Sequence, residues 1–110
     1  MGNSKKITRD EIIKILEDKK AVDIQSYDLQ ENKTKLSDFC IIASGTSSRH
    51  AEGLVDIVRK FLKTTKRQKV HVEGRAQSGW MLLESCGIEV HIFKPELREY
   101  YDIDEIMKAL

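Results

Sequence analysis

The 110-residue sequence contains little cysteine, proline or tryptophan: two cysteines, one proline and one tryptophan. Cys40 and Cys86 lie in or beside apolar runs, and neither belongs to a CxxC motif or a Cys/His cluster. We therefore expect two reduced thiols that pack as small hydrophobic side chains, rather than a disulfide framework or a zinc site.

The sequence also has almost no net charge, since 19 basic and 18 acidic residues give +1. A protein held on nucleic acid mainly by neutralising phosphates needs a basic excess. The composition therefore argues against a nucleic-acid-binding protein of this class. A local basic patch is still compatible with it. The run Lys60–Lys69 is such a patch, but a solvated helix end explains its lysines equally well.

Long hydrophobic runs are missing as well, because no stretch approaches the ~18 apolar residues of a membrane span. Residues 1–6 lead into no apolar segment, and Lys6 stands where a myristoylation signal needs Ser or Thr. We expect a soluble, cytoplasmic protein that makes no membrane contact. Its length suits a single domain over residues 1–110, with residues 1–7 flexible.

The hydrophobic periodicity of the first half predicts a helix, two strands and a second helix. Thr8 and Glu11 have the spacing of a capping box for the first helix. The run from Phe39 to Ala43 is continuously apolar, which is typical of a strand covered on both faces. The expected ranges are helix 9–19, strand 21–29, a polar turn at 30–37, strand 39–43 and helix 48–64.

The second half predicts three strands and a helical C-terminus. We expect strands near 69–73, 80–84 and 88–93, a flexible loop from Gly74 to Gly79 and a tight hairpin at Ser85–Gly87. Pro95 suits the first turn of a helix through Tyr101, and Asp102 resembles the N-cap of a last helix. Only one strand–helix–strand crossover is clear, so the pattern predicts an α/β/α fold with a mixed five-stranded sheet.

One turn has the side chains most typical of a ligand-binding site. It consists of Gly45, Thr46, Ser47, Ser48 and Arg49. A glycine turn before a hydroxyl-lined helix N-terminus can bind an anion, but the same residues also serve as a helix cap. The turn lacks the GxxxxGK[ST] spacing of a P-loop.

The same turn is similar to the start of a nucleotidyltransferase site. Magnesium-assisted phosphoryl transfer needs closely spaced carboxylates, whereas Asp56 stands alone and the pair Asp102 and Asp104 comes too late. The histidines offer only the weak pair His71 and Glu73 as metal ligands. We therefore predict no catalytic residues, no metal and no cofactor.

Trp80 begins a strand in which Trp80, Leu82 and Glu84 alternate with Met81 and Leu83. Trp80 can be a core residue or the anchor of an interface, where tryptophan and tyrosine are over-represented. The pair Tyr100 and Tyr101 beside Arg98 could join it in one aromatic and basic patch.

Residues 38–50, Asp-Phe-Cys-Ile-Ile-Ala-Ser-Gly-Thr-Ser-Ser-Arg-His, resemble the signature of the ribosomal silencing factor (Iojap-like) family. The resemblance continues in order through Glu73-Gly74, Trp80, the segment Val90–Phe93 and the motif Pro-Glu-x-Arg-x-Tyr-Tyr that starts at Pro95. It covers about residues 8–107.

This resemblance implies a nucleotidyltransferase-like α/β fold without catalytic acids. Such proteins bind large ribosomal subunit protein fourteen on the subunit-joining face, block the small subunit sterically and lower translation when nutrients are scarce. Some organelle relatives act in large-subunit assembly, and homodimers are common. The resemblance thus implies a ribosome-binding repressor in which ribosomal RNA contact is minor.

Carried over by position, the family's contact residues correspond to Trp80, Leu82, Glu84, Ser85 and Tyr101. This sequence departs from the family pattern at three places. Glu84 replaces a frequent Asp, Cys86-Gly87 replaces a Gly-Asp hairpin, and a tryptophan near the C-terminus is missing.

Overall fold

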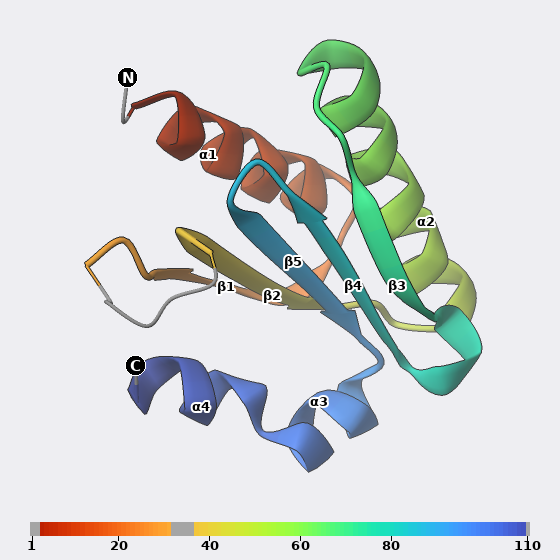
Figure 1. Ribbon diagram of the computed structural model, residues 1–110. Helices are drawn as coiled ribbons and strands as arrows, with labels where there is room; N and C mark the ends of the chain where they lie inside the picture. Colours follow the sequence, from red (N-terminus) through yellow and green to blue (C-terminus); the bar gives the residue numbers. More distant parts are fainter. Residues whose placement is uncertain (1–2, 32–36, 110) are drawn as a thin grey trace.

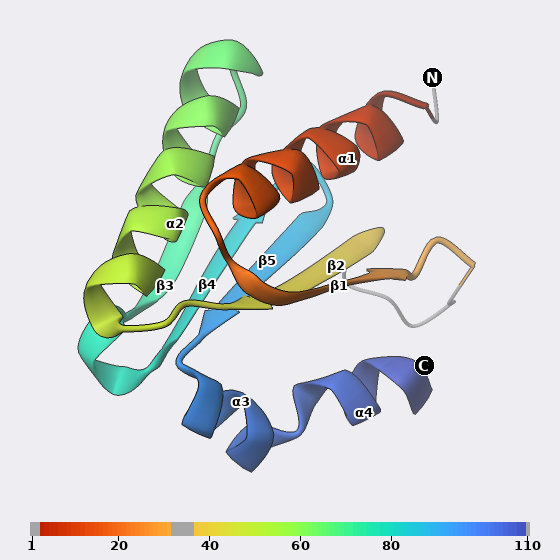
Figure 2. The ribbon, with the colours of Figure 1, turned by 180° about the vertical axis from the view of Figure 1, so that it is seen from behind.

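The computed structural model describes residues 3–31 and 37–109, which form a five-stranded sheet with helices on both faces (Figures 1 and 2). The strands are β1 Val22–Asp28, β2 Phe39–Ser44, β3 His71–Arg75, β4 Trp80–Ser85 and β5 Ile88–Phe93. The helices are α1 Asn3–Asp18, α2 Ser48–Lys60, α3 Pro95–Tyr101 and α4 Ile103–Ala109. This confirms the predicted α/β class and the order of the elements.

The sheet is mixed, with strand order β1-β2-β5-β4-β3. Strands β2 and β5 are parallel neighbours, whereas the other pairs are antiparallel. The crossover through α2 leads from β2 to β3, at the far edge of the sheet. The β4–β5 hairpin turns through Cys86 and Gly87, whose φ values are 44° and 79°. Positive φ at both central residues is the requirement of a two-residue type I′ turn, so the predicted tight hairpin is confirmed.

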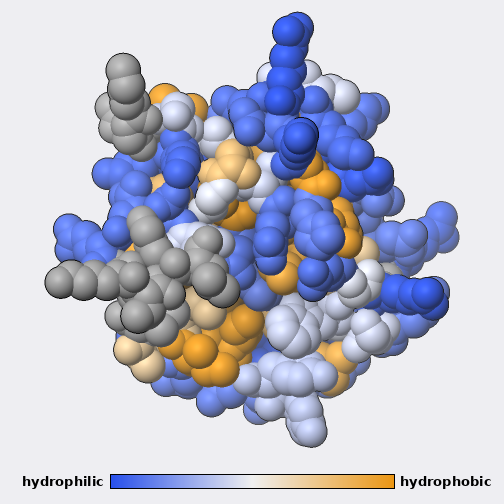
Figure 3. Space-filling model, viewed as in Figure 1, coloured by the Kyte–Doolittle hydropathy of each residue, from blue (hydrophilic) through white to orange (hydrophobic). Residues whose placement is uncertain are grey.

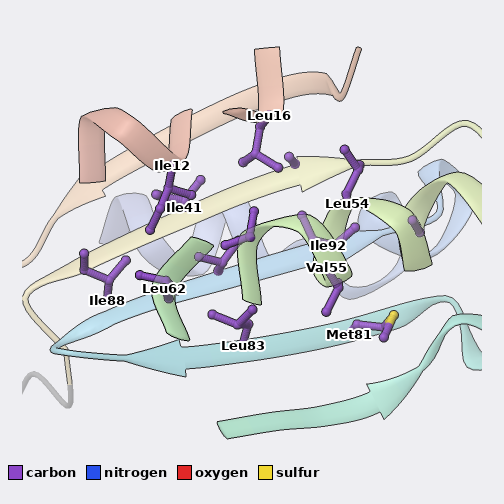
Figure 4. Close-up of a cluster of buried hydrophobic side chains, with 14 of the residues drawn as sticks. Ile12, Leu16, Ile41, Leu54, Val55, Leu62, Met81, Leu83, Ile88 and Ile92 are labelled. Carbon is purple, nitrogen blue, oxygen red and sulfur yellow. The ribbon is translucent and has the colours of Figure 1, made fainter. Parts of the chain in front are cut away.

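Helices α1 and α2 cover one face of the sheet and enclose its main core (Figure 4). Ile12 and Leu16 from α1 and Leu54 and Val55 from α2 meet alternate residues of the three central strands, and Ile41 lies among them. The other face has a smaller core, where α3 and α4 meet side chains such as Cys40 and Phe93. Every residue of β2 is buried, as its continuous apolar run predicts.

The first helix corrects the predicted start at residue 9, because α1 begins at Asn3. Thr8 is therefore not an N-cap but lies inside the helix, where its hydroxyl donates to the Ser4 carbonyl oxygen at 3.0 Å. The Lys5 ammonium donates to the Asp38 carboxylate at 2.5 Å, although the two residues are 33 positions apart in the sequence. This contact stabilises the additional first turn of α1. Residues 3–7, expected to be flexible, are thus helical, and residues 1–2 lie outside the described residues.

Two further segments differ from the prediction. Helix α2 ends at Lys60 and continues as a wider π-helical turn over Phe61–Thr65. The predicted flexible loop at 74–79 contains the end of β3 and a short 3-10 helix over residues 76–78. The backbone at the end of β3 requires a glycine at position 74. Gly74 has φ +88, and a Cβ at this position would collide with the Trp80 carbonyl oxygen on the adjacent strand. The predicted polar turn lies mostly at 32–36, outside the described residues.

The helical C-terminus divides at Asp102, as predicted, but Asp102 is not an extended N-cap. It adopts the left-handed conformation with φ 52° and ψ 38°, and its N–H donates to the Arg98 carbonyl oxygen. This geometry ends α3, whereas an N-cap has an extended backbone. Within the described residues, no helix is long and apolar enough to cross a bilayer.

Candidate protein-binding site

Strand β4 presents different side chains to the two faces of the sheet. Met81 and Leu83 are buried against α1 and α2, whereas Trp80 and Leu82 are half-buried and Glu84 is exposed on the other face. Helices α3 and α4 cover this second face mainly over β2 and β5, and its β3–β4 side is open to solvent (Figure 1). The alternation predicted from the sequence thus places Trp80, Leu82 and Glu84 on one accessible surface.

Trp80 lies at the centre of an aromatic cluster. Its ring stacks on Phe93 with centroids 5.2 Å apart and on His91 at 5.9 Å, and Tyr101 from α3 approaches at 5.0 Å. Offset aromatic contacts of this length are favourable beyond the area they bury. The cluster therefore holds the indole in a defined orientation while one part of it stays accessible.

A chain of hydrogen bonds also fixes the indole. The Trp80 Nε1–H donates to His91 Nδ1 at 3.1 Å, and His91 Nε2 lies 3.3 Å from Glu89 Oε1. Because Nδ1 accepts from the indole, the proton of the neutral ring must be on Nε2, which then donates to Glu89. This hydrogen bond from His91 lowers the pKa of the Glu89 carboxyl, burial opposes the change, and a Ser37 hydrogen bond adds to it.

A shallow hollow of about 300 Å³ adjoins the exposed part of Trp80. Its walls are mostly apolar, and it is lined by Glu73, Gly74, Ser78, Trp80, Leu82 and Tyr101. An apolar hollow with an aromatic wall and one carboxylate at its edge can receive a side chain of a protein partner. We refer to Glu73, Trp80, Leu82, Glu84 and Tyr101 together as the Trp80 surface.

Arg98 holds α3, and with it Tyr101, against the sheet. Its buried guanidinium donates to both carboxylate oxygens of Asp104, at 2.9 and 3.1 Å, and to the Ser44 hydroxyl at 3.1 Å. Tyr27 donates to Asp104 at 2.8 Å. The hydrogen bonds from Arg98 lower the pKa of Asp104, and burial together with the Asp104 bond raises the pKa of Tyr27 to about 12. Arg98 is thus a buried anchor rather than part of an exposed basic patch.

Ser85, the fifth residue carried over as a contact, points away from the Trp80 surface. Its side chain is buried on the face of Met81 and Leu83, and its hydroxyl donates to the Lys69 carbonyl oxygen at 2.7 Å. The structure thus brings Trp80, Leu82, Glu84 and Tyr101 to one side of the sheet and places Ser85 on the other.

The Gly45–Arg49 turn has the geometry of a helix cap. The Ser47 hydroxyl accepts from the His50 N–H at 3.0 Å, and the Thr46 N–H donates to His50 Nδ1 at 2.9 Å. Gly45 packs so closely on Ala51 that a Cβ would lie 2.7 Å from its backbone nitrogen. The side chain of Thr46 is exposed, as are those of Ser47 and Arg49, and Ser48 is half-buried. These contacts account for the residues of the turn, and anion binding there stays a prediction.

The acids that a nucleotidyltransferase would need are not gathered at this turn. Asp56 is exposed on α2, whereas Asp102 ends α3 and Asp104 lies in the first turn of α4, on the other face of the sheet. Among residues 3–31 and 37–109 there is no group of three His, Cys, Asp or Glu side chains that could hold a metal ion. The pair His71 and Glu73 lies 2.8 Å apart on the exposed surface of β3.

The sequence-based prediction of the site missed His91, Phe93 and Glu89. A usable signal was present: β5 also alternates, and a hairpin of known turn length pairs Trp80 with Phe93 and Leu82 with His91. The buried state of Arg98 had no comparable signal, because its partners come from distant segments of the chain.

Comparisons with known proteins agree with the family suggested by residues 38–50. Residues 3–109 match the model of the family described as "Ribosomal silencing factor during starvation". A "Ribosomal silencing factor RsfS" of Chromobacterium violaceum is 34% identical over 94 residues, covering 86% of this chain and 76% of that protein. Its counterpart of the same name in Zymomonas mobilis is 30% identical over 91 residues, covering 83% and 68%.

Two other relatives add a structure and a further function. The crystal structure of protein CV0518 from Chromobacterium violaceum superposes with a TM-score of 0.85 at 30% identity, covering 94% of this chain and 85% of that one. A mouse protein named "Mitochondrial assembly of ribosomal large subunit protein 1" is 29% identical over 75 residues, which are 66% of this chain and 33% of the mouse protein.

Proposed function

This chain belongs to the ribosomal silencing factor family, and we propose that it represses translation by binding the large ribosomal subunit through the Trp80 surface. The observation that carries the proposal is the half-buried Trp80, whose position is fixed by His91 and which forms the wall of an apolar hollow. Tryptophan and tyrosine in such positions contribute a large share of the binding energy at protein interfaces.

The partner we propose is protein fourteen of the large subunit, at the face where the small subunit joins. A standard interface buries ~800 Å² of each partner, so a protein of this size on that face would overlap the small subunit. Repression then needs occupancy alone, without turnover. We expect this action in the cytoplasm and by a protein that forms homodimers in free solution.

Co-sedimentation with isolated subunits, followed by a subunit-joining assay, tests the proposal. The protein should sediment with large subunits only, and increasing amounts should reduce the yield of joined ribosomes. Trp80→Ala should weaken binding by ~2 kcal/mol or more, about 30-fold, if Trp80 is a hot spot.

Val22→Ala is the matched control, because Val22 is an exposed apolar residue of β1, at the opposite edge of the sheet from β3 and β4. It should leave both binding and subunit joining unchanged. A folded Trp80→Ala protein that binds large subunits as tightly as wild type would refute the proposed site, and sedimentation with small subunits would refute the proposed partner.

A role in large-subunit assembly is the second candidate, and the name of the mouse relative favours it. The two roles predict different phenotypes on deletion of the gene. Loss of a silencing factor should raise translation during starvation with normal subunit ratios, whereas loss of an assembly factor should deplete mature large subunits during growth.

A further inference from the structure

We infer that the end of the molecule formed by the α1 N-terminus and the α2 C-terminus contacts the phosphate backbone of ribosomal RNA when the Trp80 surface is docked. This inference rests on the proposed function and adds an RNA partner to it. The segment from Lys60 to Lys69 contains five cations and no carboxylate, in the order Lys60, Lys63, Lys66, Arg67 and Lys69. In sequence alone, the run is equally consistent with a solvated helix end.

The fold brings a second basic segment to the same end. Lys66 forms an ion pair with Glu11 of α1, and Lys5 and Lys66 border one hollow between the two helices. Lys6 of α1 thereby lies at the same end as the α2 cations. Strongly hydrophilic side chains project from this end, at the top of Figure 3.

Some cations at this end of the molecule form ion pairs with carboxylates, and others do not. Lys5 and Lys66 are paired with Asp38 and Glu11. The other five cations are all exposed, and none of them forms an ion pair within the residues that the structure describes. These five are Lys6, Lys60, Lys63, Arg67 and Lys69. We call these five residues the basic end. Exposed cations without carboxylate partners are free to bind phosphates.

Carboxylates elsewhere in the molecule balance the positive charge of the basic end. The net charge of +1 therefore does not reveal this local excess of cations. Helices α3 and α4 carry four carboxylates, with Asp102 between the helices as a fifth, and only two cations, Arg98 and Lys108. Arg98 is itself neutralised by Asp104. The molecule is therefore polarised, with a basic end and an acidic C-terminal pair of helices, and only the basic end is complementary to a polyanion.

The basic end is continuous with the Trp80 surface. Lys69 precedes β3 by two residues, and the first residue of β3, His71, pairs with Glu84 of β4. Glu84 lies four residue steps along β4 from Trp80, a span of about 13 Å. A partner that covers the Trp80 surface thus ends close to the basic end, and on a ribosomal subunit the neighbour of a ribosomal protein is RNA.

The test is the salt dependence of binding to isolated large subunits. The triple variant K63Q/R67Q/K69Q removes three cations of the basic end. K14Q/K19Q/K108Q is the control with the same change in net charge, made in the second half of α1, just after its end and on α4. If three phosphate contacts are lost, the slope of log affinity against log salt should fall by about 2–3 in magnitude. Raising salt from 50 to 200 mM should then weaken the wild type about 30-fold more than the triple variant.

A second variant separates charge from folding. Arg67 has φ 53°, in the left-handed region that favours glycine, so R67G should leave the thermal unfolding temperature equal or higher while it weakens binding. Titration of a naked ribosomal RNA fragment identifies the partner: the triple variant should bind it more weakly than the charge control does.

Comparison with Trp80→Ala distinguishes this inference from the proposed function. If Trp80→Ala loses subunit binding and the triple variant keeps the wild-type affinity and salt slope, the RNA contact is wrong and the proposed function stands. If the triple variant binds subunits more weakly with an unchanged slope, or binds naked RNA as the wild type does, the basic end meets a protein and the RNA partner is wrong. A wild-type protein that binds no subunit would refute both.

Discussion

The two faces of the sheet differ in the polarity of their side chains and in how completely helices cover them. The face under α1 and α2 is apolar from Met81 on β4 to Phe39 and Ile41 on β2, and its side chains are almost completely buried. The face under α3 and α4 mixes apolar residues with buried polar groups such as His91 and Arg98, and it stays open along β3 and β4. The first face stabilises the fold, whereas the second holds side chains in fixed positions at the surface.

Adjacent residues of β4 offer the sharpest test of this difference. Leu83 is 1% exposed on the α1–α2 face, and Leu82 is half-buried on the Trp80 surface. Leu83→Ala should lower the free energy of unfolding by about 3 kcal/mol, because it leaves a cavity in a packed core. Urea unfolding followed by circular dichroism measures the change.

Leu82→Ala is the matched variant and should lower the free energy of unfolding by about 1 kcal/mol or less. It should weaken binding to large subunits, whereas Leu83→Ala should retain binding at temperatures where it is folded. Equal losses of stability in the two variants would contradict the assignment of the faces.

The buried Arg98 network is the second test. Arg98→Met keeps most of the side-chain volume but leaves Asp104 and the Ser44 hydroxyl without their donor. We expect a loss of about 2 kcal/mol, less than for a fully buried pair because Asp104 is 23% exposed. Binding should also weaken, because α3 carries Tyr101.

The network also predicts how stability depends on acid. Arg98 lowers the pKa of Asp104 below its usual 3.8, so the folded state favours the ionised carboxylate. The resulting stabilisation is fully present above the unfolded-state pKa and is lost as the pH falls through the lower folded-state pKa. Urea midpoints between pH 5 and 2 should therefore fall less steeply for Arg98→Met than for wild type, and parallel curves would contradict the prediction.

His91 provides a smaller test, which concerns orientation. His91→Phe keeps a ring against Trp80 but removes the acceptor of its indole N–H. We expect a loss of about 1 kcal/mol in stability and an affinity for large subunits about fivefold lower. The indole N–H resonance of the single tryptophan should shift in the variant. His71→Phe, an exposed histidine on β3, is the control and should leave this resonance in place.

Local patterns were sufficient to predict much of this fold. Alternation along β4, the apolar run of β2 and the Cys86-Gly87 turn each depend on neighbouring residues. Features that depend on distant contacts were missed. The early start of α1 needs Asp38, and the burial of Arg98 needs Ser44 and Asp104.

For the candidate site, the sequence identified Trp80 but not the residues that hold it. Extending the alternation of β4 by one residue, beyond the predicted end at 84, places Ser85 on the face of Leu83, whereas the family resemblance placed it among the contacts. The structure agrees with the strand pattern on the direction of the side chain. A period of two determines the face of each strand residue, but the hollow beside Trp80 needs Tyr101 from α3 and could not be predicted from β4 alone.

The smallest effect concerns a single proton on the α3–α4 face. Burial, together with the hydrogen bond to Asp104, raises the pKa of Tyr27 from 10.0 to about 12. A folded-state pKa above the unfolded value means that the stabilisation is present below pH 10 and is lost as the pH rises through about 12. An ultraviolet titration of the folded protein should therefore show a late step near pH 12. Tyr27→Phe should remove this step, whereas Tyr100→Phe should retain it. A late step that survives Tyr27→Phe would mean that the Arg98 network does not hold the phenol as described.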